Sequence, residues 1–404
     1  MPRIGHGFSR ISFFKIIRRS RKKSVSNPWH PCPILNHAET PGARKCTDNE
    51  TAAYFCHKNR THVTRKERLD LLAELGEYLL AEPDSELQAV IAKSYADNRW
   101  FTETNIRNAL QAIGRAFLDR KKLGAWVAGY NLLDRLHPDK TVALIMAGNI
   151  PLVGFHDWLC VFVAGQRAKV KLSEKDKHLL PYLVKWLGDR AFESWEYTEF
   201  VDDSDKLSGF DAVIATGSNN TARYFEQYFG KYPHIIRRNR NAVAVLTGYE
   251  TADDLHALGR DIFTYFGLGC RNVSKIYVPH GYHFDTLLEA LHEYRDIIHH
   301  DKYKNNFDYN LTLYILNNQQ YRNNGCLLLR EDPALQTRIA SLHYEYYDDL
   351  QDIDQLLAAR KDEIQCVVSK VQLRDFEALP FGKSQEPELN DYADGVDVMA
   401  FLAG

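Results

Sequence analysis

The sequence predicts an α/β protein with two Rossmann-like domains and a helical N-terminal region. After residue 140, short apolar runs alternate with helical runs, and this alternation is typical of parallel sheets covered by helices on both faces. Polar turns rich in Gly, Asn and Ser follow three of the apolar runs. Between residues 64 and 132, apolar residues recur instead at helical spacing.

The first elements after residue 62 are predicted helices. Thr64 and Glu67 have the spacing of a capping box, and a leucine-rich helical run follows them. Thr102 is a predicted cap after a break in the helical pattern. The further helices are expected at 87–97, 104–120 and 124–132.

The first α/β domain begins with an apolar strand at 141–146. Further strands are predicted at 168–172 and 210–215, with helices at 154–164, 177–189 and 221–228. Ligands of parallel sheets bind at the carboxyl ends of the strands. The polar turns at 147–151, 173–176 and 216–220 lie at those ends, so we expect a nucleotide cofactor there.

The second α/β domain repeats this rhythm. Its predicted strands are 242–246, 275–278, 311–316, 326–329, 339–343 and 364–369. Its predicted helices are 251–265, 284–296 and 354–360. We expect four regions: 1–62, an extension; 63–245, the helices and the cofactor domain; 246–374, the catalytic domain; and 375–404, a segment returning to the cofactor domain or to an oligomer interface.

Composition limits the class of protein. The chain has 404 residues, 45% of them apolar and 26% charged, which is typical of globular proteins with two or three domains. The chain contains no run of 18 apolar residues, so its sequence does not indicate a membrane span. Residues 1–66 carry 14 basic and 3 acidic residues, and the remaining chain is acidic. That acidic remainder gives no indication of nucleic-acid binding.

The seven cysteines are odd in number and lack paired spacing, so we expect a reducing cytoplasm and no disulfide framework. Cys32, Cys46 and Cys56 lie near several histidines, but their spacing is not that of a zinc site. We therefore expect no metal.

Residues 1–62 differ from the rest of the chain. The basic run 18–23 follows a short apolar run at 13–17, and we expect a disordered tail. A basic amphipathic segment could instead contact a membrane surface or nucleic acid. A further alternative is that the segment is not native and that translation starts at Val63 or Leu69.

Cys270 is the candidate nucleophile. It follows Gly267 and Gly269 directly, and glycines allow close approach of another molecule to the backbone. The neighbouring Arg271 is expected to favour the thiolate. The alternative is an ordinary buried thiol. Asn149, at the tip of the first strand–turn–helix unit, could donate to an oxyanion formed when the thiolate attacks a carbonyl.

These features resemble a known family. From about Leu69 to Leu402, the chain resembles the acyl-CoA reductases, which include the fatty-acid reductase subunit of bacterial luminescence systems and belong to the aldehyde dehydrogenase superfamily. The residues that carry the resemblance are the runs 146–157, 215–223, 263–275 and 391–397.

The resemblance implies roles for individual residues. Cys270 would be the nucleophile and Asn149 the oxyanion donor. Lys171 and Glu174 would hold the adenosine ribose, and the turn Thr216-Gly217-Ser218 would precede the helix that receives the pyrophosphate. Alternative roles remain open: a turn residue for Asn149, a surface pair for Lys171 and Glu174, and a helix cap for Ser218. His156 is expected to be structural.

The chain also departs from the superfamily pattern. Hydrolytic members carry a Glu-Leu-Gly-Gly motif whose glutamate activates water, whereas the stretch 235–241 has no carboxylate. A thioester on Cys270 would then exchange with coenzyme A rather than with water. Arg237, Arg238 and Arg240 are candidate ligands of coenzyme A phosphates. The usual Glu-x-Phe-Gly-Pro motif is not visible, and Glu331 is a candidate substitute.

We therefore expect an NAD(P)H-dependent reductase that converts a fatty acyl-CoA to an aldehyde through an acyl-Cys270 intermediate. The resemblance implies NADPH, although Glu174 would suit the 2′-hydroxyl of NADH. Expected partners are an acyl donor, an acyl-activating enzyme and further copies of this chain. The alternatives are a hydrolytic or phosphorylating aldehyde dehydrogenase, and an inactive subunit with the same fold.

Overall fold

The computed structural model describes residues 63–132, 138–202 and 207–403. All of them belong to the unit Asn59–Gly404, and the other unit, Met1–Lys58, lies outside them. The expectations for the extension 1–62 and for Cys32, Cys46 and Cys56 therefore fall outside the described residues. Among the residues described, no helix combines the length and the apolar character needed to cross a bilayer.

The chain begins with four helices, as the leucine spacing predicts: α2 (Arg65–Leu80), α3 (Ser85–Asp97), α4 (Glu103–Ala116) and α5 (Arg120–Ala128). The capping box of α2 is confirmed, since Thr64 Oγ1 accepts the Glu67 N–H and the Glu67 carboxylate accepts the Thr64 N–H. The predicted helix 104–120 is wrong at its end. Asp119 caps a new helix there by accepting the N–H groups of Lys121 and Lys122.

The first sheet has five parallel strands in the order β3-β2-β1-β4-β5. The strands are β1 (Thr141–Ile145), β2 (Arg167–Lys171), β3 (Thr198–Phe200), β4 (Ala212–Thr216) and β5 (His234–Arg237), and the helices between them are α6 (Phe155–Val163), α7 (Leu179–Gly188), η1 (Phe192–Tyr197) and α8 (Asn219–Phe229). The strand order reverses between β1 and β4, which is where ligands of such sheets bind.

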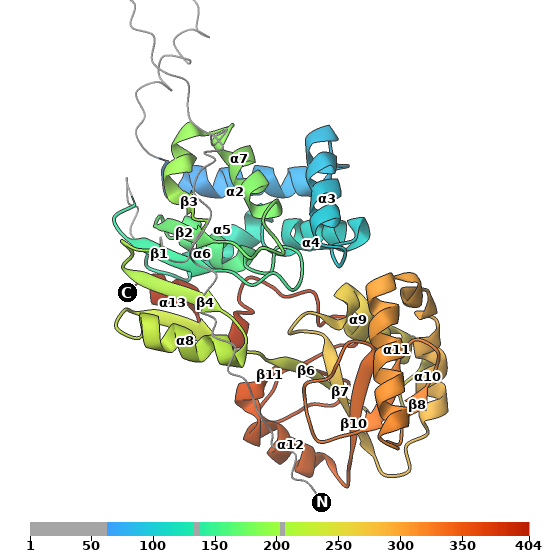
Figure 1. The fold of residues 1–404 in the computed structure, drawn as a ribbon. Coiled ribbons are helices and arrows are strands. Elements are labelled where there is room, and N and C mark those ends of the chain that lie inside the picture. Colours follow the sequence, from blue (N-terminus) through green and yellow to red (C-terminus); the bar gives the residue numbers. More distant parts are fainter. Residues whose placement is uncertain (1–62, 133–137, 203–206, 404) are drawn as a thin grey trace, which may run out of the picture. The chain divides into compact units, whose positions relative to one another are not determined.

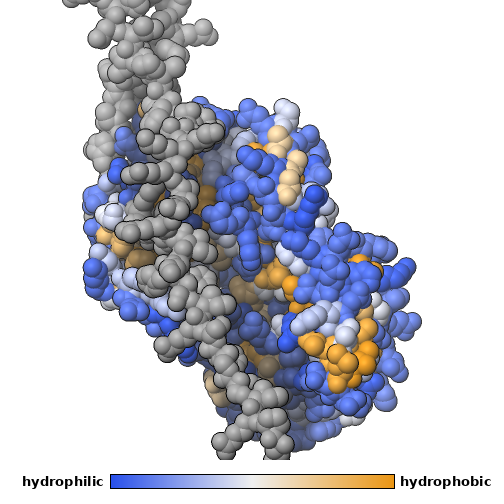
Figure 2. Space-filling view, in the orientation of Figure 1, coloured by the Kyte–Doolittle hydropathy of each residue, from blue (hydrophilic) through white to orange (hydrophobic). Residues whose placement is uncertain are grey.

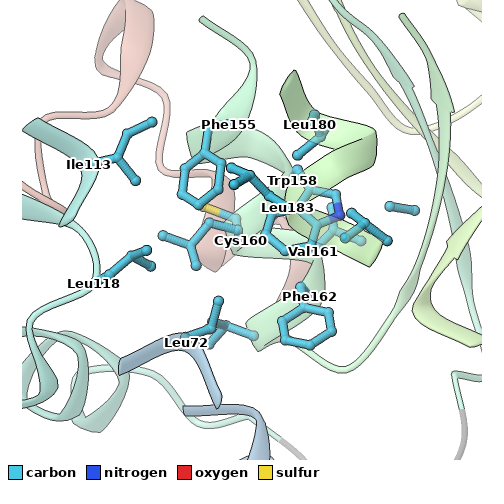
Figure 3. Close-up of a cluster of buried hydrophobic side chains, with 14 of the residues drawn as sticks. Leu72, Ile113, Leu118, Phe155, Trp158, Cys160, Val161, Phe162, Leu180 and Leu183 are labelled. Carbon is cyan, nitrogen blue, oxygen red and sulfur yellow. The ribbon is translucent and has the colours of Figure 1, made fainter. Parts of the chain in front are cut away.

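Helices cover both faces of this sheet (Figure 1). Alternate residues of β1 point to opposite faces: Val142 and Leu144 join the core beneath α2, α6 and α7, whereas Ala143 packs toward α8. Figure 3 shows the larger core, in which Trp158 lies among leucines and aromatic rings contributed by several helices. The expected doubly covered sheet is confirmed.

The second sheet has seven strands in the order β12-β11-β6-β7-β10-β9-β8, and all pairs are parallel except β8 with β9. Its strands are β6 (Asn241–Val245), β7 (Val273–Pro279), β8 (Arg322–Asn323), β9 (Leu328–Glu331), β10 (Ser341–Tyr347), β11 (Ile364–Ser369) and β12 (Ala378–Leu379). The helices of this half are α9 (Ala252–Phe263), η3 (Thr264–Gly267), α10 (Phe284–His292), η4 (Arg295–His299), α11 (Asp301–Leu316), α12 (Leu350–Ala359) and η5 (Lys361–Glu363).

One predicted strand is wrong. Residues 311–316 form the last turns of α11 rather than a strand. The buried residues Tyr303, Phe307, Asn310 and Tyr314 recur at helical spacing along this helix, and that long period outweighs the local strand propensity of the Leu-Thr-Leu-Tyr-Ile-Leu run.

The chain passes from the first sheet to the second between β5 and β6, a few residues before the predicted boundary at 246. After β12 it continues through η6 (Ala393–Gly395) to α13 (Val398–Ala403). Val398, Met399 and Leu402 of this last helix lie in the core of the first domain. Gln166 also donates to the Leu402 carbonyl at 2.8 Å.

Figure 2 shows that one face of the described chain is mostly hydrophilic, with apolar residues gathered over the half that contains α10 and α11. Ile315 and Leu316, at the end of α11, are exposed. Most apolar residues of the two halves lie instead in the cores beneath the helices.

Candidate functional site

Two cavities meet at Cys270. The larger has a volume of about 830 Å³ and extends from the turns after β1 and β4 to α11. The smaller, of about 640 Å³, lies between α4 and the chain after β12. The residues that line both cavities are Val153, Arg237, Cys270, Gln365 and Ala393. A group bound in either cavity can therefore approach the Cys270 thiol.

The loop before Cys270 has an unusual backbone. Tyr265, Phe266 and Gly267 follow α9 with φ angles of 54°, 61° and 74°. The left-handed region costs a residue with a side chain roughly 1–2 kcal/mol, so only Gly267 adopts it freely. The glycine is visible in the sequence, whereas nothing in the sequence indicates the strain at the two aromatic residues.

Asn272 holds this loop in place. Its Oδ1 atom accepts the Gly269 N–H at 2.8 Å, and its Nδ2 group donates to the carbonyls of Asp261, Ile262 and Thr264. A side chain on Gly269 would crowd Asn272, because a Cβ atom there would lie 3.0 Å from Oδ1. Sequence reasoning missed Asn272, although an asparagine two positions after the nucleophile is a visible signal.

The thiol itself is largely enclosed. Burial raises the pKa of Cys270, while the charge of Arg271 lowers it, Asp394 raises it and Arg237 lowers it. The prediction that Arg271 favours the thiolate is right about that residue's effect. The net pKa is nevertheless raised, because burial outweighs the charge of Arg271. Arg271 also donates from Nε to the Ser384 carbonyl at 2.6 Å.

Asn149 lies at the end of β1 and faces the Cys270 loop. Its Nδ2 group donates to the Leu268 carbonyl at 2.7 Å, which brings the side-chain amide within two residues of the nucleophile. The following turn contains Leu152 at a φ of 56°. Asp176 stabilises this turn, since its Oδ2 atom accepts the Leu152 N–H at 2.7 Å.

Asp176 is buried, and burial raises its pKa to about 6. Its Oδ1 atom has no hydrogen-bond partner in the described chain. From the sequence, Asp176 is recognisable only as part of a polar turn after a strand, and its contact with the Asn149 turn depends on tertiary structure.

The turn after β4 forms another wall of the larger cavity. Thr216, Gly217 and Ser218 line it, and Ser218 caps α8 by accepting the Thr221 N–H at 3.2 Å. The remaining N–H groups of the first helical turn are suited to an anion. These three predicted residues are thus brought together at the end of β4.

The predicted ribose pair lies at the carboxyl end of β2, beside the larger cavity. Neither Lys171 nor Glu174 lines the larger cavity, whereas Ser173 and Lys175 do. Lys171 donates to the Leu172 carbonyl at 3.1 Å and lies 4.0 Å from an oxygen of Glu174, which is mostly exposed. At this edge the structure places Lys175 on the cavity wall, a residue that sequence reasoning did not select.

The three predicted arginines all line the larger cavity, and each has a carboxylate partner. Arg237 pairs with Asp157. Arg238 pairs with Glu226 at 2.6 Å, and Arg240 pairs with Asp394 at 3.1 Å. Only Arg238 is an exposed side chain. The cluster is therefore not a uniform phosphate-binding surface.

Glu331 does not line either cavity, but residues 336–341 line the larger one. This turn contains Ala340 at a φ of 63°. Between β9 and β10 it is this turn, with Gln336 as its first residue, that shares the larger cavity with Cys270.

His156 lies among the rings of Phe117, Trp126 and Tyr392 and lines the smaller cavity. One ring nitrogen lies 3.0 Å from the Leu389 carbonyl, and burial lowers the pKa of the imidazole. The packing of these rings around His156 is consistent with the expected structural role of this residue. Within the described ranges, no group of three His, Cys, Asp or Glu side chains could hold a metal ion.

No model of a protein family matches this sequence, and no curated protein matches it. Solved structures do match its fold. A putative aldehyde dehydrogenase from Burkholderia cenocepacia has 16% identity and a TM-score of 0.55, over 78% of this chain and 75% of the other. Lactaldehyde dehydrogenase from Escherichia coli has 13% identity and a TM-score of 0.56, over 80% and 77%.

A third similar structure is a mutant of aldehyde dehydrogenase C from Pseudomonas syringae, complexed with NAD+ and octanal. It has 11% identity and a TM-score of 0.57, over 80% of this chain and 76% of that protein. Identities this low establish similarity of fold only. The chain has the aldehyde dehydrogenase fold, with Cys270 between two cavities.

Proposed function

We propose that this protein reduces a fatty acyl-CoA to an aldehyde with NADPH, through an acyl group bound to Cys270. The observation that carries the proposal is the wall shared by the two cavities. Among the described residues, this wall contains a thiol but neither a carboxylate nor an imidazole. A carbonyl at this shared wall would meet a nucleophile, while Asp394, the carboxylate that acts on Cys270 from the larger cavity, is ion-paired with Arg240.

The first step is acyl transfer to the protein. The Cys270 sulfur, as a thiolate, forms a bond to the carbonyl carbon of the thioester, and the carbonyl electron pair moves to oxygen. The Asn149 amide donates to the Leu268 carbonyl of the Cys270 loop at 2.7 Å. It is suited to donate instead to the negatively charged oxygen of the attacked substrate carbonyl. Collapse breaks the bond to the coenzyme A sulfur, which leaves as a thiolate and takes up a proton.

Water is a poor competitor for the resulting thioester. The carboxylates closest to Arg237 and Arg240 are Asp157 and Asp394, and each is engaged in an ion pair with one of these arginines. Burial raises the pKa of Asp394 although Arg240 and Arg237 lower it, and its carboxylate must leave the ion pair with Arg240 before it can take a proton from water. The acyl group would therefore remain on Cys270 until it is reduced or returned to coenzyme A.

The larger cavity is suited to a dinucleotide. The capped N-terminus of α8 and the turn after β1 lie on its wall, and helix N-termini bind phosphates. A nicotinamide cofactor bound there would supply the hydride that reduces the acyl group. Lys175 on the same wall supports a preference for NADPH, since a cation favours the additional 2′-phosphate.

The smaller cavity is suited to the acyl chain. On one of its walls, α4 and the residue after it contribute five apolar residues, Ala109, Ala112, Ile113, Ala116 and Phe117, beside the polar Asn108, Gln111 and Arg115. Ile150, Pro151 and Leu152 from the turn after β1 add to it. Burial of methylene groups on such a wall stabilises a bound acyl chain by about 0.8 kcal/mol per group. This wall supports a fatty rather than a short acyl group.

The proposal is tested by NADPH oxidation with acyl-CoA substrates of increasing chain length. We expect Cys270→Ala to abolish both NADPH oxidation and labelling of the protein by a radioactive acyl-CoA. Cys326→Ala is the matched control, because Cys326 is a free thiol in the core of the second domain, outside both cavity walls. Acyl labelling or turnover of Cys270→Ala at close to the wild-type rate would contradict the proposal.

A further inference from the structure

Arg237 differs from the other arginines of its stretch. It is 5% exposed, and its guanidinium is bound by the buried carboxylate of Asp157. Among the described residues, its Nε and Nη2 groups have no hydrogen-bond partner. Each buried donor without a partner costs roughly 1–3 kcal/mol, so a guanidinium retained in this state requires an explanation.

The position of Arg237 is fixed by contacts with several elements. Its main chain lies at the carboxyl end of β5, in register with Thr216, and its carbonyl accepts the Gly217 N–H at 3.3 Å. Its side chain reaches α6 through Asp157 and lines both cavities together with Cys270. Arg237 therefore presents a fixed positive charge at the junction where the thiol lies.

We propose that Arg237 stabilises negative charge at the Cys270 junction, first on the sulfur and then on the oxygen of the attacked carbonyl. Burial in a site of low polarity disfavours a thiolate, and a fixed cation offsets this cost without rearrangement. The part concerning the carbonyl oxygen rests on the proposed acyl transfer, whereas the part concerning the thiolate does not.

Other titratable groups, charged and neutral, also act on this junction. Arg271 lies next to Cys270, Asp394 approaches from η6, and Cys366 lies on the neighbouring strand β11. Asp157, Cys160 and Asp394 act on Arg237. The effect of Arg237 must therefore be measured with these groups unchanged.

A pair of variants isolates the charge of Arg237. Replacing Arg237 alone would leave the buried Asp157 carboxylate unpaired, which costs several kcal/mol and can unfold the protein. We therefore compare Asp157→Asn with the double variant Asp157→Asn/Arg237→Gln. Both lack the carboxylate, and the second replaces the guanidinium by a neutral amide that can bond to the new amide at position 157.

The readout is the rate of Cys270 alkylation by iodoacetamide from pH 6 to 11, followed by mass spectrometry of the peptide that contains Cys270. This reaction requires the thiolate but neither acyl-CoA nor NADPH. We expect the double variant to react about 10-fold more slowly at neutral pH than Asp157→Asn, corresponding to a thiol pKa higher by about one unit. The two rates should converge at high pH.

The control is Arg107→Gln in the Asp157→Asn background, because Arg107 is ion-paired on α4 and lies outside both cavities. It should leave the alkylation profile unchanged. If the double variant and Asp157→Asn have the same profile while both remain folded, Arg237 is a structural residue and the inference is wrong. Because alkylation needs no substrate, it can fail or succeed independently of acyl-CoA reduction.

Charge can also be separated from geometry. Arg237→Lys keeps the positive charge but loses the planar group that binds Asp157. We expect this variant to keep the alkylation profile of the wild type to within about 3-fold while its melting temperature falls. A 10-fold loss of alkylation in Arg237→Lys would contradict an effect of charge.

Discussion

The turn between β4 and α8 keeps ordinary backbone angles and ends in a serine cap, whereas the chain between α9 and Cys270 passes through three consecutive left-handed residues. The first turn forms a wall of the larger cavity, where the proposed cofactor would need only free N–H groups. The second must present one sulfur atom at the junction of two cavities. Its strain is held by Asn272, which makes four hydrogen bonds to the surrounding main chain.

This contrast indicates how the two walls tolerate substitution. A capped helix start depends on local interactions that many residues can supply. A strained loop depends on a few tertiary contacts, and the loss of one contact releases the strain. The variants below change the two regions in turn, from the largest expected effect to the smallest.

Asn272→Ala is expected to have the largest effect. It removes the hydrogen bonds that Oδ1 and the two Nδ2 hydrogens make to the Cys270 loop and to α9, two of whose contacts are fully buried. With a net contribution of about 1 kcal/mol for each donor or acceptor, the free energy of unfolding should fall by roughly 3 kcal/mol. Urea denaturation measures this loss. Asn317→Ala, at the exposed end of α11, should change stability by less than about 1 kcal/mol.

Asp176→Asn tests the support of the Asn149 turn. Burial raises the pKa of Asp176 from 3.8 to about 6. Its contribution to stability is therefore fully present below pH 3.8 and is lost as the pH rises through about 6. Relative to Asp176→Asn, the wild type should lose up to ~3 kcal/mol between pH 4 and pH 8. Parallel curves of stability against pH for the two proteins would show that folding does not raise the pKa of the Asp176 carboxyl.

Lys175→Gln tests the edge of the cofactor wall. Loss of one phosphate contact is worth about 1.4 kcal/mol, or a 10-fold change in affinity, so KM for NADPH should rise about 10-fold while KM for NADH stays constant. Lys177→Gln is a suitable control, since Lys177 pairs with Asp97 and does not line the larger cavity. An equal rise in KM for NADPH and for NADH would show that Lys175 does not bind the 2′-phosphate.

Ser218→Ala should have the smallest effect. It removes the cap of α8, which contributes about 1 kcal/mol, while the main-chain N–H groups of the helix remain. We expect a fall of about 1 kcal/mol in the free energy of unfolding and a change in cofactor KM of less than about 5-fold. A larger loss of cofactor binding than of stability would assign the hydroxyl itself to the cofactor.

The same contrast explains which features the sequence predicts. Strand–helix alternation, the Thr64 cap and the turns after β1 and β4 depend on local periodicity and turn chemistry, and the structure has them at the expected places. The predicted strand at 311–316 is wrong because a short apolar run does not reveal its period. The helical spacing of Tyr303, Phe307 and Tyr314 extends beyond that run.

Some roles in the site depend on tertiary contacts and have no signal in the sequence. Asp176 contacts a turn 24 positions earlier in the chain, and Arg237 binds a carboxylate 80 positions away. Gln365 reaches the cavity junction where the register between β6 and β11 shifts, and such bulges redirect side chains. None of these relations has a local signal. Sequence reasoning selected Arg237 within a basic run but could not distinguish it from the exposed Arg238.

The most direct test of the central claim is the fate of a preformed acyl-Cys270 group in the absence of NADPH. The isolated acyl-protein is divided between buffer and buffer with coenzyme A, and the released products are separated. Because the described residues of the wall shared by the two cavities include no free base, we predict rapid release as acyl-CoA and at least about 100-fold slower release as free acid. Release of free acid at a similar rate in both samples would contradict the account.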